Sequence, residues 1–138
     1  MGEIFLNIAL DLPIYKLFTY KVPENLIKEI EIGKRVLVNF SGKILTGFIV
    51  GILKDTTLEN VKDIKSVLDS GRLIEEEYIE FSNWLSQYYI QPIGEFIFSF
   101  DKRENLIKEF NIKRSSSVFR YLFISDVLNL FSICFLVR

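Results

Sequence analysis

The fold is decided by residues 27–53, IKEIEIGKRVLVNFSGKILTGFIVGIL. Within this stretch RVLVNF (35–40) alternates in the manner of a strand with one buried face. Ser41 and Gly42 then supply turn chemistry, and ILTGFIVGIL (44–53) has the composition of a return strand. The stretch therefore predicts an antiparallel β-hairpin.

Two glycines interrupt the return strand of this hairpin. Gly47 and Gly51 lie among branched and aromatic residues that favour strand structure. Glycine inside a strand usually marks a bulge or a close approach of two backbones. We therefore expect a barrel corner or a bulge here and not a flat sheet.

Shorter strand patterns flank the hairpin on both sides. EIFLNIALDLP (3–13) and LFTYKVPEN (17–25) each predict a strand that a proline stops. Downstream, VKDIKSVLD (61–69) alternates imperfectly and predicts a further strand. Residues 1–69 are thus expected to form a small bent antiparallel sheet or a β-barrel.

The period of the apolar residues changes after this point. Spacings of three and four residues from Ile74 predict an amphipathic helix from about Glu75 to Tyr89. Pro92 and Gly94 break it, and a second short helix or extended segment is expected to follow. The fold class is therefore mostly β with an appended helical unit (α+β), with a helix pair over residues 70–100. The apolar helix positions are Ile74, Tyr78, Phe81, Leu85 and Tyr88.

Residues 101–138 differ in composition from the part before them. A polar stretch precedes an apolar run from 121 to 137, whose seventeen residues are marginal for a bilayer span. We interpret 101–138 as a linker and apolar tail, the remnant of a following domain, in preference to a membrane anchor.

Most catalytic and cofactor chemistry has no counterpart in the sequence. There is one cysteine, Cys134, and no histidine, which excludes a disulfide framework, cysteine-rich zinc sites and histidine triads. Walker, dinucleotide and nucleophile-elbow motifs do not occur. We expect no cofactor, no metal and no catalysis by this chain alone. Without a secretory signal pattern, the cytoplasm is the expected location.

The formal net charge of −1 conceals an asymmetry. Residues 14–65 carry nine basic and six acidic side chains, whereas residues 69–95 carry one basic and six acidic side chains. A mildly basic first half can face phosphate, although many proteins have such a split without an anionic partner.

Aromatic and basic residues occur together on or near the predicted strands. A barrel with stacking aromatics and phosphate-facing cations can bind single-stranded nucleic acid. Equally, strand aromatics are commonly core and surface lysines are commonly solvated. The residues concerned are Phe18, Tyr20, Lys34, Arg35, Phe40, Lys43 and Lys62.

Four stretches, in order and at the right spacing, resemble one family. They are IALDLPIYKLFTYKVPE (8–24), GKRVLVNFSGKILTGFIVGI (33–52), VKDIKSVLDS (61–70) and WLSQYYIQPIGEF (84–96). Together they resemble the N-terminal 3′ DNA-binding domain of primosomal protein N′, the PriA-type replication-restart helicase of bacteria. The resemblance covers about residues 4–100.

The resemblance implies a pocket for the 3′-terminal nucleotide of a nascent DNA strand. Its aromatic residue falls on Phe18, its lysine on Lys62 and its glycine on Ser41 or Gly42. In a family member an aspartate contacts the terminal sugar where this chain has Thr19, so the contact is expected to be weaker. Further candidate phosphate contacts are Lys34, Arg35 and Lys43.

The remaining parts of that helicase have no counterpart here. The winged-helix domain, the helicase and ATP-binding motifs and the zinc-binding cysteines are missing from the sequence. The expected function is a non-enzymatic DNA-binding module of the replication-restart primosome. Its partners would be single-stranded or forked DNA with a free 3′ end and other restart proteins, with membrane contact not expected. The alternatives are a protein-interaction module that docks onto a separate helicase or replication protein, and a truncated product without function.

The segment NWLSQYYIQPIGEF (83–96) admits two interpretations, a base-stacking platform or packing against the barrel. Because the family's pocket lies on strands, we favour packing of the helical unit against the barrel. The side chains expected to do this are Trp84, Leu85, Tyr88 and Tyr89.

Overall fold

The predicted hairpin lies at the centre of the sheet. Strands β3 (Arg35–Phe40) and β4 (Lys43–Leu53) pair antiparallel in the computed structural model, with Phe40 opposite Lys43. Ser41 and Gly42 between them have φ angles of 50° and 82°, as a tight hairpin turn requires. The structure describes residues 2–99, and the linker, apolar tail and Cys134 lie outside them.

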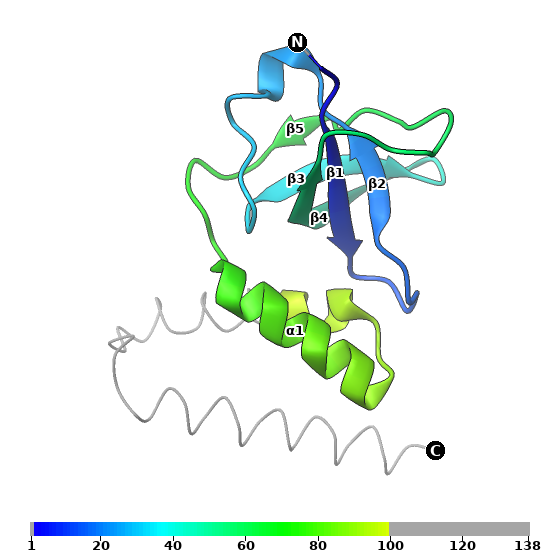
Figure 1. The fold of residues 1–138 in the computed structure, drawn as a ribbon, viewed down its shortest axis with the longest axis vertical. Helices are drawn as coiled ribbons and strands as arrows, with labels where there is room; N and C mark the ends of the chain where they lie inside the picture. The colour runs from blue at the N-terminus through cyan, green and yellow to red at the C-terminus, as the bar shows by residue number, and fades with distance from the viewer. Residues whose placement is uncertain (1, 100–138) are drawn as a thin grey trace. The chain divides into compact units, whose positions relative to one another are not determined.

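Three further strands complete an antiparallel sheet in the order β2-β1-β4-β3-β5 (Figure 1). They are β1 (Phe5–Leu10), β2 (Phe18–Lys21) and the short β5 (Ser66–Val67). A 3-10 turn, η1 (Glu24–Leu26), follows β2. The predicted mostly-β architecture with an appended helical unit is confirmed.

The segment before β5 joins the two edges of the sheet. Asp63 forms a parallel bridge with Lys21 of β2, and β5, three residues later, pairs with β3. The Lys21 N–H donates to the Lys62 carbonyl at 2.9 Å, and the Ile64 N–H donates to the Lys21 carbonyl at 3.0 Å. The sheet is therefore curled, and residues 62–64 connect its edges as in a barrel.

Both strand glycines lie at irregular or crowded points, as the sequence predicts. The register between β1 and β4 shifts between Asn7, opposite Gly51, and Ile8, opposite Ile49. At Gly47 a Cβ atom would lie 2.3 Å from the Ile8 Cγ2 atom. Glycine therefore lets β1 and β4 bulge and approach closely.

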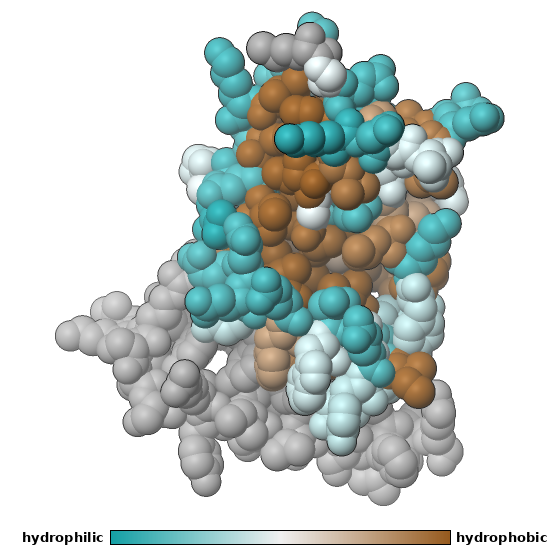
Figure 2. All heavy atoms as spheres, viewed as in Figure 1, coloured by the Kyte–Doolittle hydropathy of each residue, from teal (hydrophilic) through white to brown (hydrophobic). Residues whose placement is uncertain are grey.

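Two apolar cores stabilise the structure. The first lies inside the curled sheet and includes Leu6, Ile8, Val36 and Val38, all fully buried. The second joins the sheet to the helices through the residues Ala9, Phe48, Ile74, Ile79 and Ile97. Figure 2 shows hydrophobic residues in a band on one face, bordered by hydrophilic ones.

The helical unit consists of α1 (Glu76–Tyr89) and a second helical segment at residues 93–99. The chain leaves α1 through Ile90, which has a left-handed φ of 54°. In the second segment Phe98 places its ring edge-on against Phe48 of β4, with centroids 5.0 Å apart. The predicted helix pair is therefore present.

The predicted packing face of α1 is partly wrong. Leu85 is buried, but Trp84 is 54% exposed, Tyr88 is 67% exposed and Tyr89 is also exposed. The buried line runs instead through Ile79, Ser82 and Leu85. Ser82 is fully buried and its hydroxyl donates to the Tyr78 carbonyl at 2.7 Å, so a small polar residue occupies a contact position.

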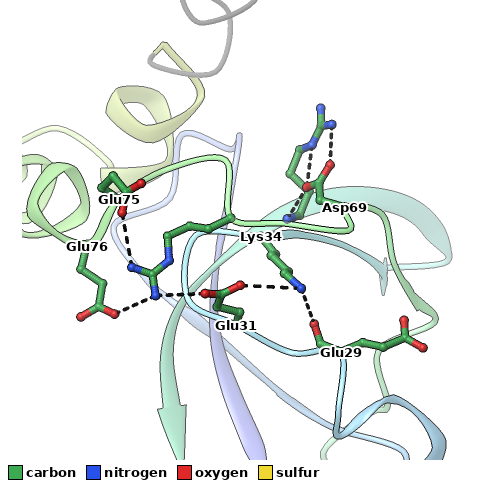
Figure 3. Close-up of polar contacts among 8 residues, drawn as sticks. Glu29, Glu31, Lys34, Asp69, Glu75 and Glu76 are labelled. Carbon is green, nitrogen blue, oxygen red and sulfur yellow. Dashed lines mark hydrogen bonds and ion pairs between the residues drawn. The ribbon is translucent and has the colours of Figure 1, made fainter. Parts of the chain in front are cut away.

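Ion pairs link the start of α1 to the loop before β3 (Figure 3). Arg72 contacts Glu31 at 3.2 Å, Glu75 at 3.4 Å and Glu76 at 3.2 Å. Glu31 also lies 3.7 Å from the Nζ atom of Lys34. The acidic first turn of α1 is thus partly neutralised by one arginine.

None of the helices among the described residues is long and apolar enough to cross a membrane.

Replacing Gly94 by alanine should destabilise the protein. A Cβ atom there would lie 1.9 Å from the backbone carbonyl oxygen of Leu10, so the second helical segment would have to move away from β1. Overpacking of this kind costs about 1–3 kcal/mol, more than the gain of about 1 kcal/mol in helix propensity. Urea unfolding of Gly94→Ala measures the loss. The control Gly71→Ala, where a Cβ atom meets nothing within 4 Å, should unfold like the parent; equal losses in both variants would contradict the account.

The Arg35–Asp69 pair should make stability depend on acidic pH. Burial alone would raise the pKa of the Asp69 carboxyl, but hydrogen bonds from the Arg35 side chain and backbone outweigh it and hold that pKa below its ordinary value of 3.8. The pair therefore stabilises the fold above about pH 4 and loses this effect as the pH falls through the folded-state pKa. Urea midpoints of the parent and Asp69→Asn should differ at pH 7 and converge at low pH. A difference that stays constant down to pH 2.5 would refute this role.

Candidate nucleic-acid interface

The edge strand β2 carries the aromatic and hydroxyl side chains predicted for the site. Phe18 is half-buried and meets Phe40 edge-on, with ring centroids 4.8 Å apart. Tyr20 is buried, and its hydroxyl donates to the Asn39 carbonyl at 3.1 Å. Alternate residues of β2 are thus both held against β3, across the curl of the sheet.

Thr19 lies between these two aromatics and pairs with Asn7 of β1. Its hydroxyl lies 3.3 Å from the Asn7 Oδ1 atom, to which it donates. A hydroxyl that donates its proton to one partner still has lone pairs with which to accept a hydrogen bond from another. The Thr19 hydroxyl can therefore accept a hydrogen bond from a ligand. An aspartate at this position would accept the same bond with a charged carboxylate.

The hairpin turn lies next to the Phe18–Phe40 contact in the chain. Ser41 and Gly42 directly follow Phe40, and both are exposed. A Cβ atom on Gly42 would meet nothing within 4 Å, so a ligand can approach its backbone. Asn39 fixes the turn by accepting a hydrogen bond from the Gly42 N–H at 3.1 Å.

Lys62 lies at the opposite end of β2 from Phe18. Its carbonyl accepts the Lys21 N–H, and its side chain is exposed. Lys21 forms an ion pair with Glu3 at 2.5 Å, and this hydrogen bond raises the pKa of Lys21. Phe18, Thr19 and Lys62 thus lie along one short strand, with Lys62 at its far end, and Phe40 connects Phe18 to the turn at Ser41 and Gly42.

The other candidate phosphate contacts differ in their surroundings. Lys34 is only 7% exposed and donates to the Glu29 carbonyl at 2.9 Å (Figure 3). Arg35 binds Asp69 through two side-chain hydrogen bonds, of 3.1 and 2.8 Å. This geometry gives both cations structural roles and offers no support for phosphate contact. Lys43 is exposed at the start of β4.

Sequence reasoning did not single out Asn7 or Asn39 as parts of this site. The available signal was a polar residue inside each of two apolar strands, FLNIAL and RVLVNF. Such asparagines often hold a neighbouring group by a hydrogen bond.

Across the described residues there is no group of three or more side chains able to hold a metal ion.

A curled antiparallel sheet with aromatic and hydroxyl groups on one edge, followed by a helix pair, is the kind of small barrel that often binds nucleic acid. The 3′DNA-binding domain (3′BD) family of PriA matches residues 7–100, and this chain belongs to that family. The resemblance noted in the sequence is confirmed.

Several relatives of this chain are replication restart proteins. Replication restart protein PriA of Buchnera aphidicola subsp. Schizaphis graminum is 31% identical over 98 residues, 70% of this chain and 13% of that protein. PriA of Rickettsia conorii is 34% identical over 85 residues, 60% of this chain and 13% of that protein. PriA of Bacillus subtilis is 34% identical over 71 residues, 50% of this chain and 9% of that protein. The chain thus spans about an eighth of the length of the first two relatives and less of the third.

Proposed function

We propose that this chain binds DNA as a module of replication restart and recognises the 3′-terminal nucleotide of a strand at a stalled fork. Family membership over residues 7–100 supports the DNA-binding part. The observation that carries the recognition of a terminus is the edge strand β2, where the Phe18 ring packs on Phe40 and the next residue, Thr19, presents a hydroxyl acceptor from the other face of the strand. In this role the chain binds DNA and carries out no catalytic step, since the matching family is a DNA-binding domain.

Each site residue has a distinct role in this proposal. Phe18, held edge-on by Phe40, forms a wall on which the terminal base stacks. Thr19 accepts a hydrogen bond from the 3′-hydroxyl, because its own proton is directed to Asn7. The open turn at Ser41 and Gly42 lets the sugar approach the backbone, and Lys62 lies close to the base or a phosphate.

Binding should depend on a free 3′-hydroxyl and on Lys62. In fluorescence anisotropy the full chain should bind a single-stranded oligonucleotide with a 3′-hydroxyl at least about fivefold more tightly than one with a 3′-phosphate, since the phosphate removes the donor. Lys62→Ala should weaken binding, and Phe18→Ala should weaken it about 5- to 100-fold through loss of stacking. Lys28→Ala, which removes the same charge from an exposed loop position, is the control. Equal affinity for both ends, or no binding, would contradict the proposal.

Thr19→Asp should increase selectivity for the 3′-hydroxyl. A carboxylate accepts from a hydroxyl in a charge-assisted bond about twice as strong as the neutral one. Asn7 can turn its amide NH₂ toward the new carboxylate, since an asparagine side chain both donates and accepts. The ratio of affinities for hydroxyl and phosphate ends should rise, whereas Thr19→Val should lower it. If Val leaves the ratio unchanged, Thr19 does not contact the terminus.

A second candidate function is docking onto a separate helicase or another replication protein. The observation in its favour is the exposed aromatic stack on α1, where Trp84 and Tyr88 lie with ring centroids 5.3 Å apart. Exposed aromatic residues are enriched in protein interfaces. Co-purification of the full chain and of Trp84→Ala with a replication-restart helicase distinguishes this function from DNA binding.

A further inference from the structure

A groove lies between the β1–β2 loop and the last two turns of α1. It encloses about 320 Å³, and its walls include Tyr15, Lys16 and Leu17 on one side and Asn83, Gln87 and Ile90 on the other. In Figure 1 the loop after β1 extends toward the end of α1, and residues of both segments line the groove. The proposed site on β2 does not use this groove.

Side-chain hydrogen bonds hold the walls of the groove in place. The Tyr15 hydroxyl donates to the carbonyl of Ile90, the residue with the left-handed φ that ends α1. The Ser86 hydroxyl donates to the Gln91 carbonyl at 2.5 Å and fixes the same turn. The groove is therefore formed by structure that is already held in place, which lowers the ordering cost of binding.

The polar groups in the walls match an unpaired nucleotide. Asn83 and Gln87 are exposed and one turn apart on α1, and each carboxamide offers an acceptor and two donors for the edge of a base. Tyr15 is 65% exposed and offers a ring for stacking. Lys16 supplies a cation for a phosphate group. Residues 81–94 contain no acidic side chain that would repel this phosphate.

The groove and the proposed 3′-end site are adjacent in the chain. Leu17 lines the groove, and the next residue, Phe18, begins β2 and forms the wall for the terminal base. We propose that the groove receives an unpaired nucleotide of the same strand, close to its 3′-terminal nucleotide. This inference rests on the proposed function and extends it from one nucleotide to a short single-stranded 3′ end.

The test combines groove variants with oligonucleotide length. The variant Lys16→Ala/Asn83→Ala/Gln87→Ala changes exposed positions only, and alanine is the better helix former at the two positions in α1. Anisotropy of the full chain with 5′-labelled, 3′-hydroxyl oligothymidylates of two, four and six nucleotides should show affinity rising with length for the parent. The variant should lose about fivefold or more with the longer oligonucleotides, and less with the dinucleotide. The control Asn25→Ala/Lys28→Ala should behave as the parent does.

The outcomes separate the inference from the proposed function. If the variant matches the parent at every length while the preference for a 3′-hydroxyl persists, the groove does not bind a nucleotide and the 3′-end site stands. If the parent shows no preference for a 3′-hydroxyl but the variant still weakens binding to longer oligonucleotides, the groove binds single strands and the 3′-end proposal fails. Absence of any binding by the parent would overturn both.

Discussion

The structure depends on one short connection, the pairing of residues 62–64 with the edge strand β2. Two backbone hydrogen bonds at Lys21 join this segment to β2, and three residues later the chain pairs with β3 as β5. Without them β2 would be an open edge with unpaired backbone groups, which is a site for aggregation. With them the sheet is curled, and one apolar core lies inside it.

The same connection determines what the candidate site contains. Because the sheet curls, Phe18 on β2 reaches Phe40 on β3, two strands that are not neighbours in the sheet order. Lys62 lies beside β2, at the end opposite Phe18, because its carbonyl accepts the Lys21 N–H. Closure of the sheet therefore brings the Phe18 and Phe40 rings together.

Local patterns predicted the sheet and the helices well because their causes are local. Alternation and turn residues in 35–53 define the hairpin, and the change of period after Gly71 defines α1. The packing face of α1 was predicted only in part: Leu85 is buried as expected, but the large aromatic residues Trp84 and Tyr88 are exposed and the small polar Ser82 is buried. The structural partners of Lys34 and Arg35 were also missed, since Asp69 lies 34 residues from Arg35 and only the fold brings them together.

The positions of the site residues were predicted from the family resemblance. The Asn7–Thr19 hydrogen bond was not predicted, because it depends on the register between β1 and β2.

The central claim is that a strand terminus binds at β2 and the hairpin turn. The most direct measurement is a ¹⁵N NMR titration of the full chain with a short oligonucleotide bearing a 3′-hydroxyl. The account predicts the largest amide shifts at Phe18, Thr19, Ser41, Gly42 and Lys62, and smaller shifts with the 3′-phosphate form. Shifts confined to other surfaces, such as the exposed aromatic face of α1, would contradict it.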